Sequence, residues 1–98
     1  MIQYNLSLFF ENSVEEKAIL ALRKIIVPEI EKQSFISRVY LFEITSHQEP
    51  DSKGFSLQCW IEPEFEKQLE IIEALVSGFL IEEFPNQHVY FPSQLKKL

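Results

Sequence analysis

The residues best suited to nucleophilic or basic chemistry are one cysteine and two histidines, Cys59, His47 and His88. A thiol beside an imidazole can form an activated nucleophile, so a Cys-His pair is the first site to consider. Cys59 lies in Phe55–Glu62, where apolar and polar residues alternate with the period of a half-buried strand. It falls on the apolar face of that strand, and a buried thiol reacts poorly. We therefore predict that Cys59 is structural.

The remaining chemical candidates are isolated carboxylates and histidines. His47, Glu49 and Asp51 alternate in a polar loop and could ligate a metal, but no fourth ligand follows at a recognised spacing. His88 could serve as a haem ligand or a base if it faced a cavity, although a histidine at a strand edge is more often a surface residue. We predict a solvated loop and no metal site.

Glu62 and Glu64 invite an acid/base interpretation, but nothing in the sequence pairs them with a third group. Carboxylates at these positions are typical of a helix start, where they meet the helix dipole. Gly54 and Gly78 are the only glycines, so the chain has no glycine-rich phosphate loop. We therefore predict no catalytic residue and no cofactor.

Periodicity defines the elements that would position any site. Strict alternation predicts a strand over Ile2–Phe10, and helical spacing follows from Ser13, which with Glu16 forms a capping-box pattern. A proline should interrupt this helix, so we expect a kink or a restart near Val27. The further predicted elements are a strand over 35–45, a strand over 55–62, a helix after Pro63 and an edge strand over 87–95 that contains Pro92.

The predicted order, βαββαβ, is the ferredoxin-like plan, an α+β fold in one domain over residues 1–98. Its four-stranded antiparallel sheet has the first and third strands at the centre and both helices on one face. The other face is left open. The central residues predicted on this open face are Gln3, Asn5, Ser7, Phe9, Ser56, Gln58 and Trp60, with Glu62 at the end of the third predicted strand.

Composition limits the partners and the compartment. A formal net charge of −6 disfavours nucleic acid and anionic membranes as general partners. No apolar run approaches the roughly 20 residues that span a bilayer. Residues 1–10 carry no Lys or Arg, so the opening lacks the basic region of a secretory signal, and a single cysteine suits a reducing compartment. We expect a cytoplasmic protein.

Three motifs resemble a family of small bacterial proteins of unknown function. They are Met1–Asn5, the Val27–Pro28 step in the first helix and Phe55–Trp60. Members typically open Met-Ile-x-Tyr-Asn, carry Ile-Pro in the first helix and have an aromatic-Ser-aliphatic-Gln third strand. Here Val27 replaces the isoleucine, and Pro92 departs from the family's final strand. The resemblance implies a dimeric α+β barrel, in which two ferredoxin-like sheets pack open face to open face, and it implies no known activity.

We therefore expect a homodimer without catalytic function of its own, whose open face serves dimerisation, a small-molecule ligand or both. Phe9 and Trp60 should lie at the centre of the interface, because two large aromatics on a bare sheet face are uncommon on soluble monomers. The alternative is a small oxygenase-like or haem-binding enzyme. It would use Trp60, Gln58, Asn5 and His88 around the barrel cavity.

Overall fold

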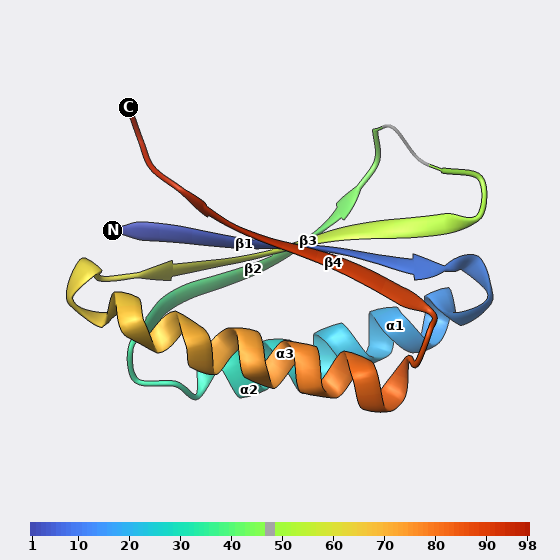
Figure 1. The fold of residues 1–98 in the computed structure, drawn as a ribbon, viewed down its shortest axis with the longest axis horizontal. Helices are drawn as coiled ribbons and strands as arrows, with labels where there is room; N and C mark the ends of the chain where they lie inside the picture. Colours follow the sequence, from blue (N-terminus) through green and yellow to red (C-terminus); the bar gives the residue numbers. More distant parts are fainter. Residues whose placement is uncertain (47–48) are drawn as a thin grey trace.

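The computed structural model describes residues 1–46 and 49–98. His47, the first residue of the candidate metal cluster, lies outside them. The main elements are β1 (Ile2–Glu11), α1 (Glu15–Ala21), α2 (Val27–Glu31), β2 (Ile36–Ile44), β3 (Ser52–Ile61), α3 (Leu69–Glu83) and β4 (His88–Leu95). The strands form one antiparallel sheet in the order β2-β3-β1-β4. This arrangement confirms the predicted ferredoxin-like fold with β1 and β3 at the centre. The helices lie together on one side of the sheet, and the other side is bare (Figure 1).

The hydrophobic core lies between the helices and the inner face of β1 and β3. Leu6 and Leu57 are directly paired across the two central strands, and both are fully buried. Burying a side chain of this size contributes about 1.5–3 kcal/mol, so the strict alternation of β1 and β3 fixes which face meets the helices. The other core side chains of the strands are Tyr4, Leu8, Phe10, Phe55, Cys59 and Ile61, and the helices contribute Ala18, Ala21, Leu22, Ile26, Ile30, Leu69, Ile72, Val76 and Leu80.

The first helix begins differently from the prediction. Asn12–Val14 form a 3-10 turn, α1 starts at Glu15, and neither element has a side-chain cap, so the predicted capping box at Ser13 is wrong. The turn itself supplies an acceptor at this end, because the Glu15 amide donates to the Asn12 carbonyl. Ser13 Oγ instead lies 3.5 Å from a Glu11 carboxylate oxygen.

The predicted interruption near Pro28 takes the form of a π turn. Between α1 and α2, residues Leu22–Ile26 adopt π-helical pairing, and the Val27 amide donates to the Leu22 carbonyl, five residues back. The α-helical pairing restarts at Val27, as expected. Proline has no amide hydrogen to donate, so it is tolerated here in the first turn of α2.

The second crossover begins with a 3-10 segment, Pro63–Gln68, which leads into α3. After α3 the chain reverses at Asn86, whose φ of 60° is the positive value that asparagine tolerates. β4 then runs along the edge of the sheet beside β1, which confirms the edge position predicted from Pro92. Within the described part of the chain, no helix has the length and apolar character needed to cross a membrane.

Candidate functional site

The open face of the sheet is a regular array of sixteen side chains, which we call the open face throughout. Strand register places four residues in each of four rows. The rows are Arg38–Trp60–Gln3–Leu95, Tyr40–Gln58–Asn5–Ser93, Phe42–Ser56–Ser7–Phe91 and Ile44–Gly54–Phe9–Val89. Seven of the residues predicted for this face lie in the two inner columns, whereas Glu62 lies beyond the end of β3, which stops at Ile61. Arg38, at one corner, is the only charged residue among the sixteen, although 24% of the chain is charged.

Five uncharged polar side chains at the centre of the open face bond to one another. Gln3 Nε2 donates to Gln58 Oε1 at 3.0 Å, and Gln58 Nε2 donates to Ser56 Oγ at 3.1 Å. Ser56 Oγ donates to Asn5 Oδ1 at 2.5 Å, and Asn5 Nδ2 donates to Ser7 Oγ at 3.0 Å. Because these groups already have partners, a second layer could cover them at little cost in lost hydration.

An aromatic cluster borders this centre on the β2 side. The Tyr40 and Trp60 rings meet edge to face with centroids 5.4 Å apart, and Phe42 lies next to Tyr40 at 6.1 Å. The Arg38 guanidinium carbon sits 5.7 Å from the Trp60 ring, within the range of a cation–π contact. Tyr40 and Phe42 are both exposed.

A second apolar border runs along β1 and β4. The Phe9 ring covers Gly54, so closely that a Cβ atom on Gly54 would lie 2.7 Å from Phe9 Cε1. Phe91 meets Phe9 edge to face at 6.1 Å, and Phe91 and Val89 are exposed. The open face therefore consists of a hydrogen-bonded polar centre between two apolar borders.

The outer columns of the open face were not found by sequence reasoning. β2 carries apolar residues at both alternating sets of positions, as in Val39–Phe42, so its sequence does not show which set faces the helices. The sequence of β4 does not show its orientation either, because most of its residues are exposed and no buried set marks the face that meets the helices. Only the register with β3 and β1 assigns Tyr40, Phe42 and Phe91 to the open face.

Cys59 lies on the helix side and is fully buried, which confirms the structural interpretation. Burial raises the pKa of its thiol from 9.0 to about 12, so the thiol stays protonated at neutral pH. A nucleophilic thiolate is thereby disfavoured.

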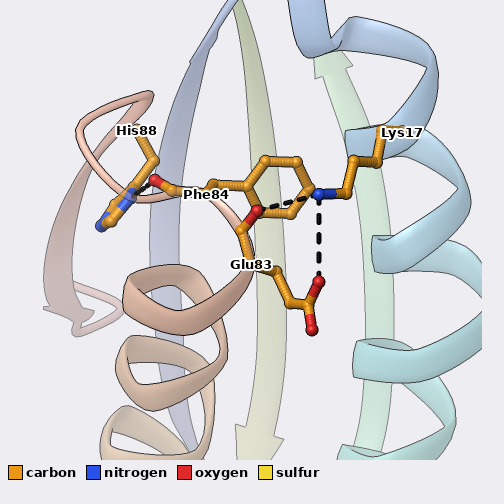
Figure 2. Close-up of polar contacts among 4 residues, drawn as sticks. All are labelled: Lys17, Glu83, Phe84 and His88. Atoms are coloured by element: carbon orange, nitrogen blue, oxygen red, sulfur yellow. Dashed lines mark hydrogen bonds and ion pairs between the residues drawn. The ribbon is translucent and has the colours of Figure 1, made fainter.

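His88 does not face the open side, and the prediction that it could line the barrel cavity is wrong. It pairs with buried Phe10 across β1 and β4 and therefore points toward the helices. Its Nδ1 donates to the Phe84 carbonyl oxygen at 2.7 Å (Figure 2). Its ring stacks on Tyr90. Through this Nδ1–H···O bond, His88 fastens the start of β4 to the end of α3.

The remaining acidic candidates do not converge. Glu62 and Glu64 are exposed and flank Pro63 at the start of the 3-10 segment, in keeping with the predicted helix-start role. Over residues 1–46 and 49–98, no three His, Cys, Asp or Glu side chains come together in a way that could hold a metal ion. The described part of the chain therefore offers the open face as its main candidate site.

No family model and no curated protein matches the sequence. Solved structures of similar fold do match along nearly the whole chain. An antibiotic biosynthesis monooxygenase is 13% identical with a TM-score of 0.72, and the match covers 100% of this chain and 99% of that one. An ethyl tert-butyl ether degradation (EthD) family protein from Bacillus halodurans is 11% identical with a TM-score of 0.65, covering 100% of both chains. A dimeric ferredoxin-like protein from an uncultured marine organism is 12% identical with a TM-score of 0.61, covering 100% and 95%. At these identities the likeness shows the ferredoxin-like fold.

Proposed function

We propose that this protein is a cytoplasmic homodimer without catalytic function of its own, in which the open faces of two copies pack together and enclose a small interior. The observation that carries the proposal is the composition of the open face, which has one charged residue in sixteen and exposed aromatic side chains on both borders. Protein interfaces are depleted of charge at their core and enriched in aromatic residues. A second copy is a suitable occupant because the similar structure from the uncultured marine organism is described as dimeric.

A two-fold dimer would let the same face serve both partners. The exposed rings on the borders would lose contact with water, and the central amides and hydroxyls would keep the hydrogen bonds they already make within one copy. Spare lone pairs and protons on Gln3 and Ser7 could bind trapped water or an uncharged ligand. The seven predicted residues, Gln3, Asn5, Ser7, Phe9, Ser56, Gln58 and Trp60, would line this interior.

Phe91→Glu is the sharpest test of the interface. Phe91 is 58% exposed and belongs to the edge strand, so the change should leave the folded monomer intact. In the dimer it would place an unpaired charge in an apolar layer at two symmetric positions. We expect the dissociation constant to rise by at least about 30-fold, since a charge left buried and unpaired in an interface costs about 2 kcal/mol or more. Trp60→Glu is less clear, because Arg38 would stand beside the new carboxylate.

The matched control is Ile81→Glu on α3, because Ile81 is 63% exposed and belongs to the helix layer. Sedimentation equilibrium at micromolar concentration should show a dimer for the wild type and this control, and monomer for Phe91→Glu. Native mass spectrometry of the same samples would report any retained small molecule. A monomeric wild type, or equal dissociation by both variants, would refute the proposal.

The alternative of an oxygenase-like or haem-binding enzyme has less support. It depended partly on a cavity-facing His88, which instead bonds to the Phe84 carbonyl on the helix side. Titration with haemin tests it directly. A Soret shift that persists in His88→Gln would require another ligand and would revive the haem-binding interpretation.

A further inference from the structure

A second concave site lies on the helix layer, away from the open face. It is a cavity of about 380 Å³ between α1 with the following π turn on one side and the end of α3 on the other. This volume is at the lower end of the range for small-molecule pockets. Its lining residues are Lys17, Leu20, Ala21, Lys24, Ile25, Phe79, Glu83 and Phe84. We call this site the helix groove.

The walls of the helix groove are mainly hydrocarbon. Leu20 from α1 is 54% exposed and Ile25 from the π turn is 47% exposed, which is high for side chains of this size. Phe79 and Phe84 form the opposite wall, and Phe84 itself is almost fully buried. An apolar ligand would remove Leu20 and Ile25 from water without any rearrangement of the core.

The charges at the rim favour an anion, although the chain as a whole is acidic. Lys17 Nζ donates to the Glu83 carbonyl at 2.9 Å, lies 3.9 Å from the Glu83 carboxylate and stands 4.8 Å from the centre of the Phe84 ring (Figure 2). Lys17 therefore offsets the one carboxylate of the rim. Lys24 makes no hydrogen bond or ion pair with any described residue, so its ammonium group remains available.

We infer that the helix groove binds an aliphatic monocarboxylate, with its hydrocarbon chain between Leu20, Ile25 and Phe79 and its carboxylate at Lys24. The orientation follows from the charges. The carbonyl end of α3 and Glu83 repel an anion near Lys17, so the headgroup belongs at Lys24. The cavity volume limits the ligand to one hydrocarbon chain of moderate length.

Decanoate, kept below its micelle concentration, is the probe, with decanol and decylammonium as its neutral and cationic counterparts. Isothermal titration calorimetry should give tighter binding for decanoate than for either counterpart. Amide NMR shifts should change at Ala21, Ile25 and Phe79. The side-chain signal of Trp60, the only tryptophan, should not move, because Trp60 lies on the open face.

Two variants separate the contribution of the ligand's carboxylate from that of its hydrocarbon chain. Lys24→Gln should weaken decanoate binding about tenfold, since a charge-assisted hydrogen bond is lost, and should leave decanol binding unchanged. Leu20→Gln should weaken both ligands. The control is Lys67→Gln, because Lys67 is an exposed lysine of the 3-10 segment Pro63–Gln68 and does not line the groove.

Three results would overturn the inference: no decanoate binding at millimolar concentration, binding that is indifferent to Lys24→Gln, or shifts centred on Trp60. A fall in molecular mass caused by Leu20→Gln would also overturn it, because it would assign the groove to a second copy of the chain. None of these results bears on Phe91→Glu, so this inference and the proposed dimer can fail separately.

Discussion

Gly54→Ala tests the close contact between the Phe9 ring and Gly54. Gly54 has no positive φ, so alanine is acceptable to the backbone and any cost must come from its methyl group. That methyl carbon would lie 2.7 Å and 3.0 Å from two carbons of the Phe9 ring and 3.3 Å from Ile44 Cδ1. Ordinary contacts of this kind begin near 3.4 Å, so the ring must move by several tenths of an ångström.

The sign of the change in stability depends on two opposing terms. Overpacking typically costs about 1–3 kcal/mol, and the lower end applies here because Phe9 is only partly buried and its ring can shift. Replacing glycine lowers the entropy of the unfolded chain, which contributes about 0.4–1 kcal/mol in the other direction. With about 1–2 kcal/mol for the overpacking and about 0.4–1 kcal/mol for the entropy term, we expect Gly54→Ala to destabilise the protein by about 0 to 1.6 kcal/mol. In a Phe9→Ala background the same change should stabilise it.

Gly78→Ala is the matched control, since the chain has only these two glycines. A Cβ atom on Gly78 would meet nothing within 4 Å, and the residue lies inside α3. Alanine there should stabilise the protein by about 0.8–1 kcal/mol through helix propensity. Urea unfolding of all variants measures these changes in the free energy of unfolding. The measurement is made at two protein concentrations, because a contribution from dimerisation would change with concentration. Equal stabilisation by both alanines, or a Gly54→Ala cost that survives in Phe9→Ala, would refute the contact between Phe9 and Gly54.

Two predictions follow from the buried ionisable groups. Cys59 should react with a thiol reagent at least an order of magnitude more slowly in native buffer than in denaturant, and equal rates would place it on the surface. Burial also raises the pKa of Cys59 from 9.0 to about 12, and burial followed by Glu73 raises that of Tyr4 from 10.0 to about 12. Above pH 9 the unfolded chain therefore binds fewer protons than the folded one, so the free energy of unfolding should fall as pH rises toward 12, by up to about 1.4 kcal/mol per pH unit for each group. Urea midpoints that do not change between pH 8 and pH 11, or a Cys59→Ala variant whose fall begins at the same pH, would contradict this.

The sequence predicted the inner half of the open face because β1 and β3 alternate without interruption. Once Leu6 and Leu57 are assigned to the core, Asn5 and Gln58 must face the other way. The same logic fails for β2, where both faces are apolar and the register with β3 shifts between Ile36 and Arg38. A register shift of this kind arises only when two strands pair, so the sequence of one strand alone does not predict it.

Two local signals failed for a different reason. The Ser13 pattern described a capping box, but Asn12–Val14 form a 3-10 turn in which the Glu15 amide donates to the Asn12 carbonyl, and sequence spacing does not decide between the two arrangements. The face of His88 depended on where the turn at Asn86 delivers the chain into β4. Both outcomes depend on backbone geometry, which the identities of Ser13 and His88 do not specify.

The distribution of charge explains how one small sheet can leave a face free for a partner. The helices carry most of the acidic residues and keep the chain at a net charge of −6, which opposes association between copies through the helix layer. On the open face only Arg38 is charged, and it is held over Trp60 at a corner. Two copies can therefore approach through this face with their acidic helices on the outside, separated by two sheet layers. Each sheet is about 10 Å from the next layer, which is comparable to the screening length at physiological salt. In the proposed dimer the helix groove would remain on the outside, so ligand binding there and pairing of the sheets would use opposite sides of the sheet (Figure 1).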